Sequence, residues 1–260
     1  MTQQEMVQVE IDDAIAVVTM NLPERRNAFG ANMRKELHAT FSRLMHDTPE
    51  VRALVLTGAN GTFCSGGDIS EMKHRPLLAH RAHMAMPTGI AEMMMTGPKP
   101  MVAAVQGHAI GAGMSLATAC DYIVTTPTAR YCCAFVRMGL LPDTGILWSL
   151  AQKVGRGKAR ELMMLATEFD GTEAVRLGVA NEVAEPEALL DAAKKVARRY
   201  AAQPPIAMAL LRSVLNEGCD SLTQALRTET DLQGPLSHTN DHKEAVNAFL
   251  EKRKPVFTGS

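Results

Sequence analysis

Apolar residues recur along the chain at two different spacings, which predict strands and helices respectively. Short apolar runs typical of buried strands are "AIAVVTMN" (14–21), "VRALVLTGAN" (51–60), "KPMVAAVQG" (99–107) and "DYIVTT" (121–126), with "RYCCAF" (130–135) a weaker one. Between the first two, residues 31–47 place Met33, Leu37, Phe41 and Leu44 on one face of a helix. Strands that alternate with helices predict an α/β fold built from parallel βαβ units.

The pattern changes towards the C-terminus, where only helical spacings occur from about Glu185 onward. One apolar stripe runs along residues 187–203, and helical segments follow at 204–218, 221–236 and 242–255. We therefore expect a mixed core over residues 1–200 and a C-terminal helical region over residues 201–260.

Composition narrows the class of protein. The chain has 260 residues, of which 46% are hydrophobic and 21% charged, as in ordinary globular proteins. Its 27 basic and 28 acidic residues nearly cancel, so we expect no nucleic-acid partner. The N-terminus has neither a basic start nor an apolar run, and no apolar stretch of about 18 residues occurs, so we expect no secretory signal and no membrane span. The five cysteines are unpaired in spacing, which favours a reducing cytoplasm and gives no metal-ligand pattern.

Two glycine-rich turns stand out, each after a predicted strand and before a predicted helix. They are "GANGTFCSGGDISEM" (58–72) and "VQGHAIGAGMSLATACD" (105–121). Glycines let backbone N–H groups approach a ligand closely, and two such turns could direct two N–H groups at one carbonyl oxygen. Tight packing of strand against helix is the alternative explanation for the same glycines.

Asp143 is the carboxylate of interest. Between Ala112 and Arg160 the only other acidic residue is Asp121, whose place between a helix and a strand predicts a structural role. Asp143 could be a turn or N-cap residue before "TGILWSLAQK". It could also be a general acid/base whose pKa is raised by its apolar neighbours Leu140, Leu141, Ile146 and Trp148.

Four segments along the chain resemble a known protein family. "GTFCSGGDISEM", "KPMVAAVQGHAIGAGMSLATACDYIV", "FVRMGLLPDTG" and "AFLEKRKPVF" are similar, in this order, to the enoyl-CoA hydratase/isomerase (crotonase) superfamily. The resemblance implies a spiral of repeated ββα units with C-terminal helices that form trimers or dimers of trimers. It also implies an acyl-CoA thioester as substrate, bound in a two-amide oxyanion hole, with CoA present only as part of that substrate and no metal or other cofactor.

Carried over position by position, the resemblance assigns the oxyanion amides to Gly67 and Ala112. It assigns contacts with CoA or substrate to the loops around these two amides, to the basic residues before "NAF" and to a C-terminal lysine that reaches a neighbouring subunit. These residues are Arg25, Arg26, Ser65, Gly66, Asp68, Ile69, Gly111 and Lys252. Ordinary solvated surface charge is the alternative for the two arginines and the lysine.

The sequence departs from the family's hydratases at both of their catalytic glutamates, because those positions hold Ser115 and Phe135. Hydration needs a base to activate water and an acid to protonate carbon, and neither residue suits that work. Asp143 instead matches the acid/base carboxylate of the family's Δ3,Δ2-enoyl-CoA and ring 1,2-epoxyphenylacetyl-CoA isomerases. We therefore expect an isomerase. The alternatives are an atypical hydratase, a relative such as a dehalogenase, and a non-catalytic acyl-CoA-binding protein.

Overall fold

The strands form two sheets in the computed structural model, which describes residues 5–260. The larger sheet contains, in spatial order, β1 (Val7–Asp12), β2 (Ile15–Met20), β3 (Ala53–Gly58), β4 (Met101–Val105), β6 (Tyr122–Thr125) and β9 (Glu182–Val183). The smaller contains β5 (His108–Ile110), β7 (Arg130–Cys132) and β8 (Phe169–Asp170). In the larger sheet β2, β3, β4, β6 and β9 run parallel and β1 is antiparallel to β2. In the smaller sheet β5 is parallel to β7 and β8 is antiparallel to it.

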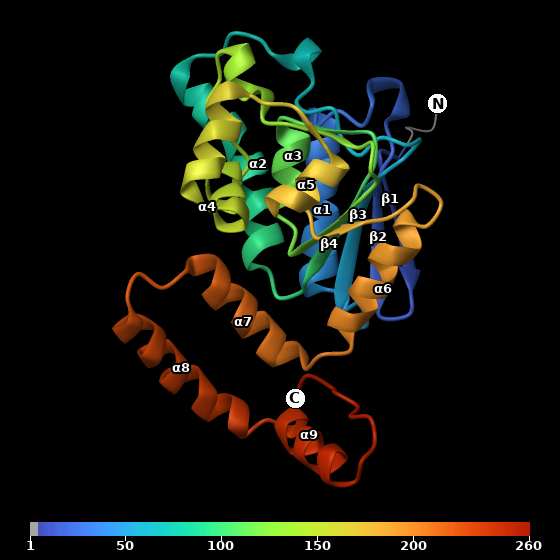
Figure 1. Cartoon of the computed structure of the whole chain (residues 1–260), viewed down its shortest axis with the longest axis vertical. Helices are drawn as coiled ribbons and strands as arrows, with labels where there is room; N and C mark the ends of the chain where they lie inside the picture. Colours follow the sequence, from blue (N-terminus) through green and yellow to red (C-terminus); the bar gives the residue numbers. More distant parts are fainter. Residues whose placement is uncertain (1–4) are drawn as a thin grey trace.

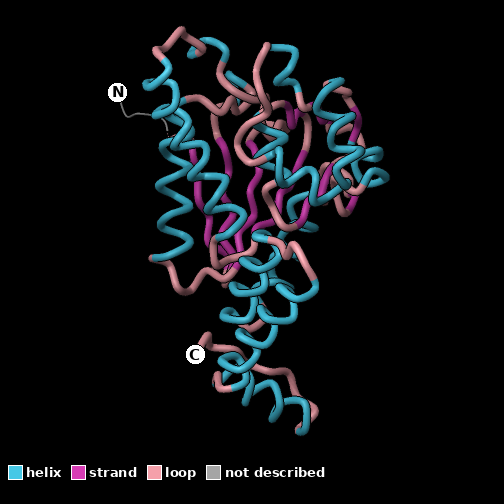
Figure 2. Tube along the Cα trace, turned by 90° about the vertical axis from the view of Figure 1, so that its left-hand side faces the viewer, coloured by secondary structure: helices cyan, strands magenta, loops and turns pink. Residues whose placement is uncertain are grey.

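Helices pack on both faces of the larger sheet, and three C-terminal helices lie beyond it (Figures 1 and 2). Over residues 5–260 they are α1 (Ala31–His46), α2 (Leu77–Thr96), α3 (Ala112–Thr118), α4 (Ile146–Leu165), α5 (Gly171–Leu177), α6 (Leu189–Ala201), α7 (Pro205–Glu217), α8 (Leu222–Ser237) and α9 (Asn240–Leu250). Short 3-10 helices are η1 (Pro23–Arg25), η2 (Ile69–Glu71) and η3 (Ala134–Met138).

Both faces of the larger sheet are buried, which explains why its strands read as continuous apolar runs. All six residues of β3 are buried. Successive side chains point to opposite faces, so Val55 packs in the cluster that includes Val196 of α6, and Leu54 packs in the cluster that includes Phe41 of α1. The sheet thus forms a rigid layer from which the loops after β3 and β4 emerge.

The predicted elements are largely confirmed. Each of the five apolar runs contains a strand, the helix over 31–47 is α1, and helices dominate after Glu185. The predicted parallel pairing holds for β2, β3, β4 and β6, whereas the unpredicted β1 and β8 pair antiparallel. β1, β5, β8 and β9 were not predicted. In β1 the alternation of Val7, Val9 and Ile11 with polar residues was overlooked, whereas strands of two or three residues leave no periodic signal.

The C-terminal helices leave the core after α6. α7 lies against α2, while α8 and α9 extend beyond the core (Figure 1). α8 has no buried residue, and apolar side chains on α7, α8 and α9 are exposed, among them Leu215, Leu222 and Phe249. Large apolar side chains exposed on consecutive helices are typical of surfaces that bind other protein chains.

Candidate active site

The first glycine-rich loop follows β3 and turns sharply at Gly66. This residue has φ +104°, and a Cβ there would lie 2.8 Å from the carbonyl oxygen of Ile110, so a side chain is excluded. The fully buried Asn27 fixes the start of the loop, because its Nδ2 donates to the carbonyl oxygens of Ala59 and Thr62 at 3.0 and 2.6 Å. The loop therefore has a fixed backbone conformation.

The second glycine-rich loop is hydrogen-bonded directly to the first. The N–H of Cys64 donates to the carbonyl oxygen of His108 at 2.7 Å, and the N–H of Ile110 donates to that of Cys64 at 3.1 Å. At Gly113 a Cβ would overlap the Cys64 carbonyl oxygen, at 2.2 Å. Glycine at this position lets the start of α3 lie against the first loop. Each loop was predicted to lead from a strand through a turn into a helix. The structure differs at both: the first loop leads into the 3-10 helix η2, and the second contains the short strand β5 before α3 begins.

The two amides expected to form an oxyanion hole lie in these adjoining loops. A Cβ on Gly66 would be only 3.9 Å from the nitrogen of Ala112, the first residue of α3. Gly111, just before it, has φ +53°. Within residues 5–260, the N–H groups of Gly67 and Ala112 donate no hydrogen bond. Two neighbouring free amides can bind an oxygen that carries negative charge.

Asp143 lies in the loop between η3 and α4, with its side chain partly buried. Thr144 Oγ1 donates a hydrogen bond of 2.9 Å to its Oδ1. Burial raises the pKa of Asp143 above its ordinary value of 3.8, against the opposing effects of this hydrogen bond and of Arg34 and His80 nearby. The alternative N-cap role is not observed, because the N-cap of α4 is Gly145 and no side chain caps it.

A hydrogen bond ties the loop of Asp143 to the helix that begins at Ala112. Ser115, fully buried on α3, donates from its Oγ to the main-chain carbonyl oxygen of Asp143 at 2.9 Å. Ser115 lies one turn after Ala112 on α3, so the hydrogen bond holds the loop of Asp143 close to the N-terminal turn that carries the free amide. The other departure from the hydratase pattern, Phe135, is buried and carries no ionisable group.

The expected apolar enclosure of Asp143 is corrected by the structure. Of the four neighbours predicted to surround it, only Ile146 is buried. The exposed fractions of the other three are 42% for Leu140, 73% for Leu141 and 39% for Trp148. The loop instead packs against α2, since a Cβ on Gly145 would lie 2.8 Å from Cε of Met95. The loop that carries Asp143 is therefore packed by a contact distant in sequence.

The residues predicted to contact CoA on the first loop form a polar network. Arg25 Nη1 donates to Asp68 Oδ2 at 2.6 Å and to Ser70 Oγ at 3.0 Å, and Asp68 in turn caps η2 by accepting from the Ser70 N–H. The N–H of Ser65 donates to the carbonyl oxygen of Arg26 at 3.0 Å, and Arg26 is exposed. Ile69, also predicted here, is 67% exposed. Arg25 is thus engaged with Asp68, while Arg26 and Ile69 face solvent.

Comparison with known proteins identifies the family. A family model described as "Enoyl-CoA hydratase/isomerase" matches residues 10–260. The chain belongs to the enoyl-CoA hydratase/isomerase family. It is 35% identical to a short-chain-enoyl-CoA hydratase of Clostridium acetobutylicum, with 95% of each chain covered. It is 31% identical to the 1,2-epoxyphenylacetyl-CoA isomerase of Escherichia coli, with 98% of this chain and 99% of the relative covered.

Solved structures agree with this family and with the predicted crotonase-like α/β fold. A putative enoyl-CoA hydratase from Streptomyces coelicolor superimposes with a TM-score of 0.92 at 33% identity, covering 100% of this chain and 96% of the other. An enoyl-CoA hydratase from Polaromonas sp. JS666 gives a TM-score of 0.90 at 31% identity, with 96% and 99% of the two chains covered. The predicted fold class is confirmed.

In this member of the enoyl-CoA hydratase/isomerase family, Lys252 lies apart from the glycine-rich loops of its own chain. It is exposed and follows α9, and the chain beyond it contacts the start of β3, where Arg52 donates to the carbonyl oxygen of Phe257. The first glycine-rich loop leaves the opposite end of β3, which spans roughly 20 Å for six residues. Lys252 therefore does not join the loops within one chain.

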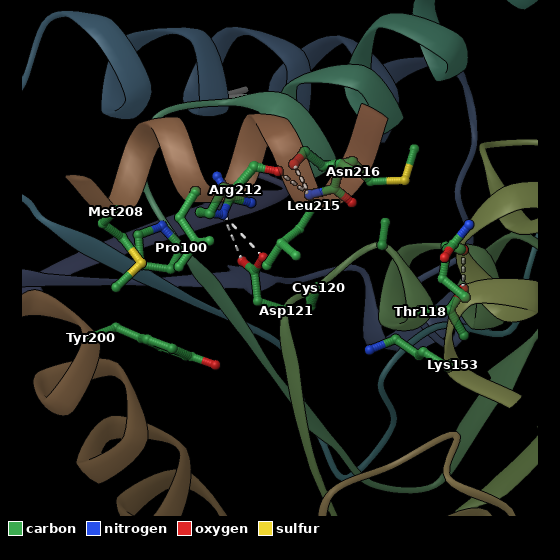
Figure 3. A pocket seen from close by; sticks show the side chains of 15 residues that line it. Pro100, Thr118, Cys120, Asp121, Lys153, Tyr200, Met208, Arg212, Leu215 and Asn216 are labelled. Atoms are coloured by element: carbon green, nitrogen blue, oxygen red, sulfur yellow. Dashed lines mark hydrogen bonds and ion pairs between the residues drawn. The ribbon is translucent and has the colours of Figure 1, made fainter. Parts of the chain in front are cut away.

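The predicted structural role of Asp121 is confirmed by its contacts. It accepts hydrogen bonds from the Met101 N–H at 2.7 Å and from Arg212 Nε at 3.0 and 3.1 Å, and Arg212, 4% exposed, also donates to the carbonyl oxygens of Met94 and Gly97. Figure 3 shows this pair beside a cavity of about 370 Å³ that Thr118 and Lys153 also line. The ion pair of Arg212 with Asp121 attaches α7 to the core. It lies beyond the C-terminal end of α3, whereas the glycine-rich loops lie at its N-terminal end.

Two residues of reactive types near the loops, Cys64 and His108, have pKa values shifted by burial. Burial raises the pKa of Cys64 to about 12, so its thiol stays protonated at neutral pH. Burial and the charge of Arg26 lower the pKa of His108, which favours the neutral imidazole.

Over residues 5–260 no group of three His, Cys, Asp or Glu residues could hold a metal ion. In the same range no helix is long and apolar enough to cross a bilayer.

Sequence reasoning missed three residues that shape this site. Asn27 lies inside the quoted "RRNAFG" stretch, yet nothing there shows that its side chain is buried under the first loop. Ser115 was singled out only because it replaces a glutamate of the hydratases, and its hydrogen bond to the loop of Asp143 was not predicted. Arg34, on the polar side of the α1 pattern, has a side chain only 12% exposed. Its position beside Glu71 depends on tertiary contacts that no local pattern encodes.

Proposed function

We propose that the chain is an enoyl-CoA isomerase that moves a C=C bond of an acyl-CoA thioester. Gly67 and Ala112 bind the thioester carbonyl oxygen through their N–H groups, and Asp143 carries the proton. The observation that supports this most is the Ser115 hydrogen bond, which joins the loop of the one candidate carboxylate to the helix of a free amide. The required chemistry needs no cofactor, because CoA belongs to the substrate.

The proposed reaction has two proton transfers through one carboxylate. Asp143 removes a proton from C2 of a 3-enoyl thioester, and the electron pair of that C–H bond delocalises into the carbonyl to give a dienolate. The two N–H groups stabilise the negative oxygen, an interaction whose loss costs about 3–4 kcal/mol per donor elsewhere. Asp143 then returns the proton to C4, the C2=C3 bond forms and the carbonyl is restored. A raised pKa makes Asp143 a better base for the first step.

A hydratase is the second candidate, and the name of the Clostridium relative favours it. Hydration would need a further group that activates water. Ser115 does not serve well, because within residues 5–260 its hydroxyl donates only to main-chain carbonyl oxygens, those of Asp143 and Gly111, and to no side-chain base. The name of the Escherichia relative favours isomerisation.

We also propose that the chain works as a homotrimer or a dimer of trimers. The apolar side chains exposed on α7, α8 and α9 would then contact neighbouring copies. Lys252, exposed after α9, would reach the CoA phosphates of a neighbouring subunit, and Arg25 and Arg26 would face the CoA of their own. Light scattering coupled to size exclusion tests this, with a monomer as the contradicting mass.

The proposal is tested by offering purified protein 3-enoyl-CoA and 2-enoyl-CoA of equal chain length. We expect conversion of the first into the second, and loss of that conversion in Asp143→Asn. Asp47→Asn, which removes an exposed carboxylate at the end of α1, is the matched control and should behave as wild type. The product is identified by its absorbance and by mass.

Three results would contradict the proposed isomerase. Hydration of 2-enoyl-CoA that survives in Asp143→Asn would favour the hydratase. Isomerisation that survives in this variant would exclude Asp143 as the proton carrier. Tight binding of both thioesters without turnover would favour a non-catalytic acyl-CoA-binding protein.

A further inference from the structure

Arg34 carries a mostly buried guanidinium group that forms an ion pair but, within residues 5–260, no hydrogen bond. Its side chain is 12% exposed and lies over the ring of Phe29, with Cζ 5.9 Å from the ring centroid. Within residues 5–260 the guanidinium makes no hydrogen bond. Its ion-pair partner is Glu71, whose Oε2 lies 3.6 Å from Nη2, beyond hydrogen-bond distance, and already accepts from the Ala31 N–H at 2.7 Å. Guanidinium donors removed from bulk water need acceptors.

The unused donors lie near the proposed reacting groups. Glu71 follows the first glycine-rich loop, and a Cβ on Gly67 would be 3.3 Å from Cε of the adjoining Met72. Arg34 and Asp143 are close enough for each charge to affect the other's pKa, yet they form no ion pair within 4.0 Å. Arg34 is therefore connected through Glu71 and Met72 to the Gly67 amide, and we expect an acyl group bound at that amide to come close to it.

The surrounding charges favour an oxygen acceptor over a hydrocarbon chain. Basic side chains are dense from residue 73 to residue 83, and no acidic residue occurs between Glu71 and Glu92. The basic residues are Lys73, His74, Arg75, His80, Arg81 and His83. Arg75 donates to the carbonyl oxygen of Glu71 at 3.5 Å, and the charges of Arg34 and Arg75 help to lower the pKa of His83, after the larger effect of burial. A purely apolar acyl chain would cover the Arg34 donors and leave them unpaired.

We infer that Arg34 determines substrate specificity by donating to an oxygen atom of the acyl group. The preferred thioester then carries a hydrogen-bond-accepting oxygen beyond the reacting carbons, as a carboxylate or as a hydroxyl. The planar guanidinium suits either acceptor, and a carboxylate can accept two of its N–H groups. This inference rests on the proposed isomerisation at Asp143.

The test compares three 3-enoyl-CoA substrates of equal carbon number: one ends in a methyl group, one in a hydroxyl and one in a carboxylate. Wild type is expected to show the highest kcat/KM on one of the oxygenated substrates. Arg34→Met should lower kcat/KM on that substrate at least tenfold and leave the methyl-terminated substrate nearly unchanged. Arg34→Lys, which keeps the charge, should recover activity on the carboxylate more than on the hydroxyl.

Lys35→Met is the matched control, since it removes an exposed cation from the next position of α1. It should leave all three kcat/KM values as in wild type. Thermal unfolding verifies that each variant is folded. If Arg34→Met does not fold, the comparison of Arg34→Lys with wild type on the three substrates still tests the inference.

The outcomes separate this inference from the proposed function. An equal loss on all three substrates in Arg34→Met, or a wild-type preference for the methyl-terminated one, overturns the role of Arg34 while isomerisation stands. Absence of isomerisation of every substrate by wild type overturns the proposed function itself. A shift of the pH profile in Arg34→Met with unchanged substrate preference indicates that Arg34 acts on Asp143 alone, which also overturns the inference.

Discussion

Replacing Ser115 with alanine tests whether the hydrogen bond from α3 positions Asp143. The change removes one buried hydroxyl, which donates to the carbonyl oxygen of Asp143 at 2.9 Å and approaches that of Gly111 at 3.4 Å. Loss of such a donor costs about 1–3 kcal/mol. The Ile146 N–H, at 3.4 Å, remains on the same carbonyl oxygen, so we expect a loss near 1 kcal/mol. For a chain of this size Tm should fall by roughly 2–4 °C per kcal/mol.

The effect on turnover should exceed the effect on stability. Ser115 contacts the main chain of Asp143, so the alanine variant keeps the carboxylate but frees its loop. Misplacement of a reacting group by about 1 Å can lower a rate on the order of a hundredfold. We expect kcat for 3-enoyl-CoA to fall by about ten- to hundredfold, with KM little changed, because the thioester still binds the two amides.

Thr118→Val is the matched control for Ser115→Ala. Thr118 is buried at the other end of α3, where its Oγ1 lies 2.8 Å from Ser149 Oγ, so this variant also loses a buried hydroxyl on α3. Its Tm should fall comparably while its kcat stays near that of wild type. Steady-state kinetics and thermal unfolding on the three proteins decide the matter. The reasoning is refuted if Ser115→Ala loses stability yet keeps wild-type kcat, or if both variants lose kcat equally.

Three further predictions follow from single contacts. Burial raises the pKa of Asp143, so kcat/KM for isomerisation should decline on acidification with a midpoint above pH 3.8, as the carboxylate becomes protonated; a midpoint at or below 3.8 would contradict this. Gly66→Ala places a Cβ 2.8 Å from a carbonyl oxygen at φ +104°, so it should lower Tm more than Gly61→Ala, which is strained in φ but has open space; equal losses would exclude the steric argument. Arg212→Met leaves Asp121 without its buried partner and should lower the free energy of unfolding by about 3–5 kcal/mol in a urea titration, and a loss below about 1 kcal/mol would contradict the assigned role of this pair.

The sequence predicted those parts of the fold that depend on local pattern. Continuous apolar runs indicated β2, β3, β4 and β6, because both faces of their sheet are buried. The two glycine-rich turns were located by their glycines, and at Gly66 and Gly113 the structure shows why no side chain fits. The strands β8 and β9 were not predicted, since two residues are too few to show a repeating pattern of apolar and polar positions.

The contacts that complete the site could not be predicted in the same way. The burial of Asp143 was expected from its sequence neighbours, but Leu141 is exposed and the loop packs against α2 instead. Ser115 and Asp143 are 28 residues apart, and Arg34 meets Glu71 across 37 positions. Such pairs arise from tertiary packing, which the spacing of residues within one element does not report.

The most direct test of the account measures removal of the C2 proton by Asp143. The substrate is 3-enoyl-CoA deuterated at C2, and NMR follows the loss of C2 deuterium in wild type, Asp143→Asn and Asp47→Asn. General acid–base groups contribute about 10²–10⁴-fold to rate, so Asp143→Asn should slow this loss by at least about a hundredfold while Asp47→Asn does not. Loss of deuterium from C2 in Asp143→Asn at the wild-type rate would contradict the central claim.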